Sequence, residues 1–73
     1  MTEFEADLKE LAEIIQEKDT IKFRQKLMRM FDKMQVSNTK KYYKNKINSL
    51  CKRTTGESYE KLFLYGFPGS TEQ

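Results

Sequence analysis

Histidine is absent from the 73-residue sequence, and cysteine occurs once, at position 51. Without imidazole there is no histidine general base, no Ser–His or Cys–His nucleophile and no histidine-liganded metal. A single thiol forms no internal disulfide and cannot fill a zinc or iron–sulfur site. A lone cysteine is typical of a reducing compartment, so we expect an intracellular protein, cytoplasmic or nuclear, with no cofactor and no metal.

Glycine-rich and long apolar stretches are also missing. Gly66 and Gly69 are close in sequence but precede no expected helix, which excludes a phosphate-binding loop. No segment approaches the ~20 apolar residues of a membrane span, and the acidic N-terminal stretch is no secretory signal. The carboxylates Glu10, Glu13 and Glu17 are expected on an exposed face without a pocket. We therefore expect no enzyme, no membrane partner and no small-molecule substrate.

The length of the chain limits its architecture. A chain of ~60 residues buries only about 60% of its unfolded surface, so stability is expected to be marginal and a homo-oligomer would be a natural supplement. The sequence is 37% hydrophobic, with five Phe, four Tyr and four Met, which suffices for one compact core without a deep cleft. We expect a single helical domain over residues 1–69 and a frayed tail at residues 70–73.

Apolar residues recur at spacings of three and four, which predicts helices over residues 3–17, 21–34 and 39–53 and a short last helix ending near residue 65. The expected inward faces are Phe4, Leu8, Leu11 and Ile15; Phe23, Leu27, Met30, Phe31 and Met34; Tyr43, Ile47, Leu50 and Cys51; and Tyr59, Leu62 and Phe63. Short connections favour packing of neighbours side by side. The expected fold is all-α, a small antiparallel bundle of three helices plus a short fourth C-terminal helix.

Polar residues near the expected helix starts predict caps, which satisfy backbone amides that lack a partner within the helix. The candidates are a capping box of Thr2 with Glu5, residues 18–20 for the second helix, Ser37 or Asn38 for the third, and a capping box of Thr54 with Glu57 for the last.

Charge is segregated along the chain. Residues 1–20 hold seven acids and two bases, net −5, and residues 21–36 hold five bases and one acid, net +4. Residues 37–54 hold six bases and no acid, net +6, and residues 55–73 hold one base and three acids, net −2. A basic middle attracts phosphate or an acidic protein surface. The alternative is that the acidic first helix neutralises the basic third helix within the fold.

The basic segments supply the leading candidate site, which would bind nucleic acid or the acidic surface of a nucleic-acid-handling protein. Lysine neutralises phosphate, asparagine can contact sugar or base edges, and an exposed tyrosine can stack on a base. The candidate residues are Lys22, Lys26, Arg29, Lys33, Lys41, Tyr42, Lys44, Asn48 and Lys52. A solvated helix face that serves solubility is the alternative for the stripe in residues 21–34.

The aromatic C-terminal segment, residues 59–67, supplies the second candidate. One interpretation is that Tyr59, Leu62 and Phe63 close the core. The alternative is that Leu64, Tyr65 and Phe67 leave an exposed patch of the kind found at protein interfaces. The alternative function is thus a protein–protein adaptor or inhibitor that binds through this patch.

Two broader patterns involve the middle of the chain. Two helices joined at residues 35–38 allow a helix-turn-helix interpretation, but this connection lacks glycine and Lys41 occupies a position that is generally apolar in that motif. About a third of the chain resembles the four- to five-helix interaction domains of transcription elongation factors, with a gap near residues 38–42. The resemblance rests on Leu27, Phe31, Met34-Gln35-Val36-Ser37 and Ile47-Asn48-Ser49-Leu50. It implies a protein-docking module, not an enzyme.

Overall fold

The computed structural model describes residues 3–34 and 37–68, with side chains in the second range from residue 39 onward, and these residues form four α-helices and no strand. The helices are α1 Glu3–Glu17, α2 Thr20–Asp32, α3 Ser37–Thr55 and α4 Tyr59–Tyr65. The all-helical prediction is confirmed. None of the four described helices has the length and apolar character of a membrane span. The tail predicted at residues 70–73 lies outside the described residues.

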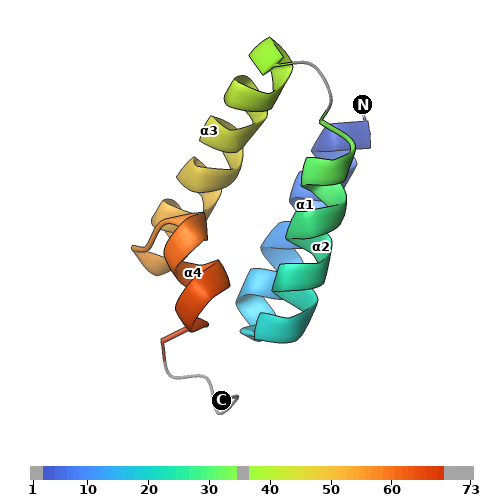
Figure 1. Ribbon diagram of the computed structural model, residues 1–73. Helices are drawn as coiled ribbons and strands as arrows, with labels where there is room; N and C mark the ends of the chain where they lie inside the picture. The colour runs from blue at the N-terminus through green and yellow to red at the C-terminus, as the bar shows by residue number, and fades with distance from the viewer. Residues whose placement is uncertain (1–2, 35–36, 69–73) are drawn as a thin grey trace.

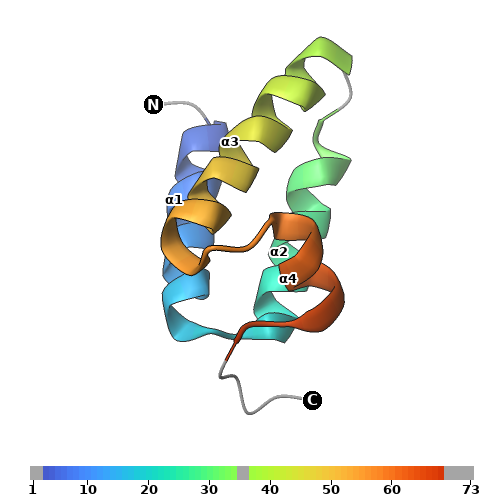
Figure 2. The same cartoon turned by 90° about the vertical axis from the view of Figure 1, so that its left-hand side faces the viewer.

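The helices pack as two pairs. In Figure 1, α1 and α2 lie on one side of the molecule, and α3 and α4 lie on the other. α1 packs against both α2 and α3, and α4 packs against both α2 and α3. The first turns of α3 extend beyond the adjacent ends of α1 and α2 in both views (Figures 1 and 2). Along α3, the exposed residues include Lys41, Asn45, Lys46, Ser49, Lys52 and Arg53.

The connection between α1 and α2 follows local sequence. Lys18 has a left-handed backbone, with φ of 56°, which turns the chain after α1. Asp19 then caps α2, because its side chain accepts a hydrogen bond of 3.1 Å from the backbone amide of Lys22. The cap predicted within residues 18–20 is thus confirmed. The candidate cap at Thr2 and the cap side chains of residues 37–38 lie outside the described residues.

The cap predicted before α4 is wrong. Thr54 still belongs to α3, and its hydroxyl donates to the carbonyl oxygen of Leu50 at 2.7 Å instead of pairing with Glu57 in a capping box. Ser58 caps α4 and accepts from the backbone amide of Lys61 at 3.2 Å. The predicted end of the third helix therefore falls short, since α3 runs on to the bend that precedes Ser58.

One core joins all four helices. Its fully or almost fully buried side chains are Leu11, Ile14, Ile15, Phe23, Leu27, Met30, Met34, Ile47, Leu50, Cys51, Leu62 and Phe67. Most of the predicted inward positions are confirmed; Phe4, Leu8, Phe31, Tyr43, Tyr59 and Phe63 pack on this core but are only partly buried. The rings of Phe4 and Tyr43 stack at 3.8 Å between centroids, which ties α1 to α3. Burying one such large side chain stabilises the fold by about 1.5–3 kcal/mol.

Candidate functional site

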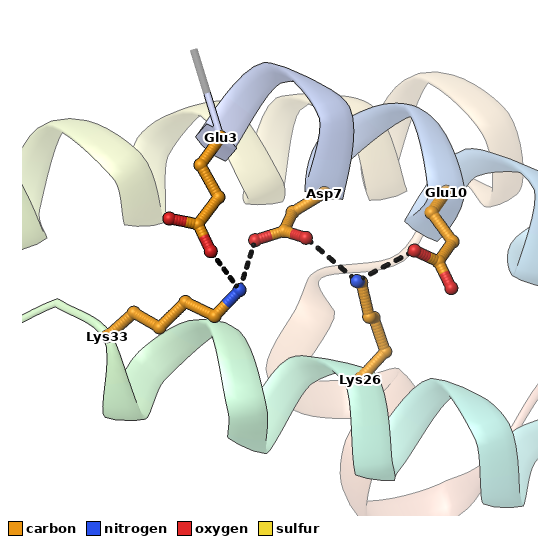
Figure 3. Close-up of polar contacts among 5 residues, drawn as sticks. All are labelled: Glu3, Asp7, Glu10, Lys26 and Lys33. Atoms are coloured by element: carbon orange, nitrogen blue, oxygen red, sulfur yellow. Dashed lines mark hydrogen bonds and ion pairs between the residues drawn. The ribbon is translucent and has the colours of Figure 1, made fainter.

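Two of the four cations predicted on α2 are engaged by α1. Lys26 Nζ donates to Asp7 Oδ1 at 2.8 Å and to Glu10 Oε1 at 2.9 Å. Lys33 Nζ donates to Glu3 Oε2 at 2.7 Å and to Asp7 Oδ2 at 3.0 Å. Asp7 thus bridges the two ammonium groups, as Figure 3 shows. We call these five side chains the α1–α2 charge network.

The charge network is partly shielded from solvent at its centre. The side chains of Lys26 and Asp7 are 13% and 12% exposed. Burial alone would raise the pKa of Asp7, but the hydrogen bonds and charges of the two lysines hold it below its ordinary value. Burial alone would lower the pKa of Lys26, but its carboxylate partners raise it, and hydrogen bonds to Glu3 and Asp7 raise the pKa of Lys33. Asp7, Lys26 and Lys33 are therefore charged at neutral pH.

Of the other two cations predicted on the second helix, Lys22 pairs with a carboxylate of α1, and Arg29 has no ion pair within the described residues. Lys22 Nζ lies 3.8 Å from Glu17 Oε1 at the surface. Arg29 lines an open groove between α1 and α2, of about 300 Å³, together with Glu10 and Glu13. The sequence left open whether α1 neutralises the third helix. Within the described residues, Glu3, Asp7, Glu10 and Glu17 of α1 pair with Lys22, Lys26 and Lys33. The surface over α2 is consequently of mixed sign.

α3 has a different surface. Lys41, Lys46, Lys52 and Arg53 are exposed, and the helix contains no acidic residue. Within the described ranges, no carboxylate lies at ion-pair distance from these four groups. Tyr42 is 56% exposed beside them, and Lys46 Nζ lies 5.4 Å from the centre of its ring. We call these five residues the α3 basic face.

The sequence prediction identified only part of the α3 basic face. It selected Lys41, Tyr42 and Lys52 but left Lys46 and Arg53 out of the candidate site. The run of six bases without an acid in residues 37–54 was the signal that would have included both.

Two predicted site residues of α3 have contacts within the fold. Lys44 is partly buried, and its Nζ lies 5.7 Å from the centre of the Phe31 ring. Asn48 Oδ1 accepts a 3.1 Å hydrogen bond from the backbone amide of Tyr59, the first residue of α4. Asn48 thereby satisfies an amide that has no partner within α4. Because these contacts hold both side chains against the fold, we leave both residues out of the α3 basic face.

The aromatic C-terminal patch is smaller than predicted. Leu64 and Tyr65 are 64% and 78% exposed, but Phe67 is only 5% exposed. Gly66 ends α4 with φ of 84°, and the chain then turns toward α2. The rings of Phe67 and Phe23 pack in a T-shaped arrangement, with their centroids 5.2 Å apart. The prediction that Phe67 belongs to an exposed patch is therefore wrong.

Sequence reasoning did not assign a role to Arg24. Its Nε donates to the carbonyl oxygen of Phe63 at 2.6 Å, and its Nη2 donates to that of Leu64 at 3.4 Å. A cation at the end of a helix satisfies free carbonyls and complements the negative end of the helix dipole. Arg24 therefore fastens the end of α4 to α2.

The described residues contain no group of three or more Cys, Asp or Glu side chains placed to hold a metal ion. Cys51 is fully buried, and burial raises the pKa of its thiol to about 12. The thiol is thus protonated at neutral pH and is not available as a nucleophile. The α3 basic face offers non-covalent contacts to phosphate or carboxylate groups.

No protein-family model, curated protein or solved structure matches this chain. The resemblance to elongation-factor domains therefore has no support beyond the residues quoted for it. Function must be inferred from the surfaces that the four helices present.

Proposed function

We propose that this chain is a non-catalytic, regulatory binding protein that docks a polyanion on the α3 basic face. The partner is nucleic acid or an acidic surface of a nucleic-acid-handling protein. One observation carries the proposal: the five exposed cations of α3, Lys40 included, have no carboxylate at ion-pair distance within the described residues, whereas Lys22, Lys26 and Lys33 pair with carboxylates of α1. A cytoplasmic or nuclear location is part of the proposal, supported by the single unpaired thiol.

A solubility role alone explains the α3 basic face less well. Solubility is served by charges of both signs interspersed over a surface, and like charges three or four residues apart cost a helix about 0.2–0.5 kcal/mol per pair. In α3, like charges at these spacings occur between Lys40 and Lys44 and between Lys41 and Lys44, and the helix holds no acid to offset them. A surface of one sign concentrates oppositely charged partners and speeds their association. Polyanion binding therefore accounts for a helix surface of one sign better than solubility does.

Fluorescence anisotropy with a labelled mixed nucleic-acid pool tests this function. Four phosphate contacts give a salt exponent of roughly −3.6, so affinity should fall about 100-fold between ~50 and ~200 mM salt. Lys41→Glu/Lys46→Glu should abolish binding, because two of four contacts become repulsive. The control Lys9→Glu/Lys61→Glu changes net charge equally on other helices and should retain most binding. Lys44 is avoided because it covers Phe31.

Two outcomes would contradict this function. The first is no binding of nucleic acid or of polyglutamate, an acidic-surface mimic, even at low salt. The second is equal loss of binding in the two double variants, since overall charge and not the α3 basic face would then control the interaction.

A second candidate function is supported by the exposure of Leu64 and Tyr65 at the end of α4. Large exposed apolar side chains are enriched at protein interfaces. This function is a protein adaptor or inhibitor whose docking persists at high salt. Leu64→Ala/Tyr65→Ala should abolish such docking in a high-salt binding assay and should leave polyanion binding unchanged; the opposite pattern would contradict it.

We also propose that the bundle is antiparallel, beginning with α1 and α2. The order of the ion pairs supports this course, because Glu17 near the end of α1 meets Lys22 near the start of α2, and Glu3 at the start of α1 meets Lys33 after the end of α2. Nuclear Overhauser contacts between the same ends would test it. Contacts joining the starts of both helices would contradict an antiparallel course.

A further inference from the structure

Four of the six cations of α3 form two rows, and Lys40 and Lys44 lie outside them. At ~100° per residue, Lys41 and Lys52 share one edge of the exposed surface, and Lys46 and Arg53 share another edge about 120° further around the axis. At 1.5 Å per residue, the first pair spans roughly 16 Å and the second roughly 10 Å along the helix. All four are exposed. The two rows can thus contact two separate lines of phosphate at once.

Between the rows lies a neutral strip. Asn45 and Ser49 are exposed and fall between the two rows in the same helical projection. An amide and a hydroxyl one turn apart provide hydrogen-bond donors and acceptors without charge. Asparagine can pair with the N6 and N7 positions of adenine, and serine can bond to several bases. This centre is suited to base edges, whereas the rows are suited to phosphates.

The dimensions of α3 match one nucleic-acid surface. A helix with its side chains is about 10–12 Å across, and the major groove of B-form DNA is about 12 Å wide. The first turns of α3, which carry Lys41, extend past α1 and α2 (Figures 1 and 2), so this end can enter a groove without those helices meeting its walls, while Lys52 and Arg53 in the last turn are exposed. In contrast, the major groove of an RNA duplex is too deep and narrow for side chains to read its base edges.

Single strands fit this surface less well. Proteins that bind single strands generally stack successive bases on several exposed aromatic rings. On α3, Tyr42 is exposed but has the Lys46 ammonium near its ring, and Tyr43 is stacked against Phe4. The other strongly exposed tyrosine, Tyr65, is on α4. A row of stacked bases along α3 therefore has one ring at most among the described side chains.

We infer that the polyanion is duplex DNA and that α3 lies in its major groove, an inference that rests on the proposed function of the α3 basic face. Lys41 and Lys52 contact the phosphates of one strand, Lys46 and Arg53 contact those of the other, and Asn45 and Ser49 face the base edges. This arrangement does not require a helix-turn-helix motif, because α2 is held by α1 through Lys26 and Lys33.

Anisotropy with four labelled probes tests the inference: a mixed-sequence DNA duplex of about 20 base pairs, its single strand, the RNA duplex of the same sequence, and polyglutamate. We expect the DNA duplex to bind at least 10-fold more tightly than the other three. Dimethyl sulfate then distinguishes the grooves, because guanine N7 lies in the major groove and adenine N3 in the minor groove. We expect protection of guanine N7 alone.

Two variants separate the rows from the strip. Lys41→Gln/Lys46→Gln should halve the salt exponent, from roughly −3.6 to about −1.8, because two phosphate contacts are lost. Asn45→Ala/Ser49→Ala should leave the salt exponent unchanged. It should reduce, at least threefold, the ratio of the affinities for DNA duplexes of different sequence. If this affinity ratio falls in Lys41→Gln/Lys46→Gln but not in Asn45→Ala/Ser49→Ala, the assignment of Asn45 and Ser49 to the base edges is wrong.

The failures are distinguishable. Equal or tighter binding of single-stranded DNA or of the RNA duplex, or protection of adenine N3 instead of guanine N7, overturns groove binding and leaves the proposed function intact. Binding of polyglutamate alone identifies an acidic protein surface as the partner and also overturns groove binding. Binding of none of the four probes overturns both the inference and the proposed polyanion function.

Discussion

Asp7 is the residue whose replacement should perturb the bundle most among the charged side chains. It is 9% exposed and accepts hydrogen bonds from Lys26 and Lys33 at 2.8 and 3.0 Å. Asp7→Asn preserves the shape of the side chain but removes its charge. The NH₂ group of the new amide also faces the ammonium group of Lys26 or Lys33. Both groups are hydrogen-bond donors only, so that contact is lost. Lys26 then keeps a single carboxylate partner in its partly buried position, Glu10.

The expected loss follows from burial. A hydrogen bond to a charged group contributes about 1.5–3 kcal/mol, and breaking a fully buried ion pair costs about 3–5 kcal/mol. The pair of Asp7 with Lys33 contributes little to stability, because the Lys33 side chain is 48% exposed. The pair of Asp7 with Lys26 contributes more, because the Lys26 side chain is only 13% exposed. We expect Asp7→Asn to lower the free energy of unfolding by about 2–3 kcal/mol. For a chain of this size that corresponds to a Tm lower by roughly 8–24 °C.

Urea and thermal unfolding followed by circular dichroism measure this loss. Glu13→Gln is the matched control, because it removes an exposed carboxylate from the same helix that lines the groove without an ion pair among the described residues. The control should change the free energy of unfolding by less than about 0.5 kcal/mol. If Asp7→Asn proves as mild as Glu13→Gln, the charge network is not stabilising and the reasoning is wrong.

The same comparison has a defined pH dependence. Because the folded-state pKa of Asp7 lies below its ordinary value, its contribution is complete above the unfolded pKa of about 3.9 and is lost as the pH falls through the folded pKa. The stability difference between the wild type and Asp7→Asn should thus be constant near neutral pH and shrink in strong acid. A difference that disappears between about pH 5 and pH 7 would assign the effect to another group.

Three further predictions concern other buried positions. Gly66→Ala should destabilise the fold by about 1–3 kcal/mol in urea unfolding, and more than Gly56→Ala, because both glycines have positive φ but only a Cβ at Gly66 meets Thr20 Oγ1, at 3.1 Å; equal effects would show that the contact is unimportant. Thr20→Val should leave the free energy of unfolding unchanged or raise it, because the buried Thr20 hydroxyl has no hydrogen-bond partner in the part of the chain that the structure describes. A loss above about 1 kcal/mol would contradict this. Cys51 should react with a disulfide reagent at least about 100-fold more slowly in the native state than in urea, because its thiol is buried with a pKa of about 12; rapid native labelling would contradict the burial.

Much of the fold could be predicted because its determinants are local. Helical spacing identified Phe23 and Leu27 as inward-facing, and the break at residues 18–20 predicted a cap, which Asp19 supplies. These features depend on neighbours within one or two turns. The burial of Phe67 could not be predicted in this way, since it depends on the direction in which Gly66 turns the chain toward α2.

The candidate site was harder to predict, for a related reason. The sequence shows that Lys26 is a cation on a helix, but not that Asp7, 19 positions away, will face it. Likewise, Asn48 resembles a surface amide until α4 folds back and brings the amide of Tyr59 to it. Charge along a chain is visible in the sequence, whereas neutralisation depends on which helices become neighbours. The α3 basic face is what remains once those pairs are known.

Titration of ¹⁵N-labelled protein with a DNA duplex, followed residue by residue by NMR, tests the central claim most directly. We predict that the largest amide shifts occur on the outward surface of α3, at Lys41, Asn45, Lys46 and Lys52, and that they diminish as salt is raised. Shifts centred on Leu64 and its neighbours in α4, or no shifts at low salt, would contradict the claim that the α3 basic face is the binding surface.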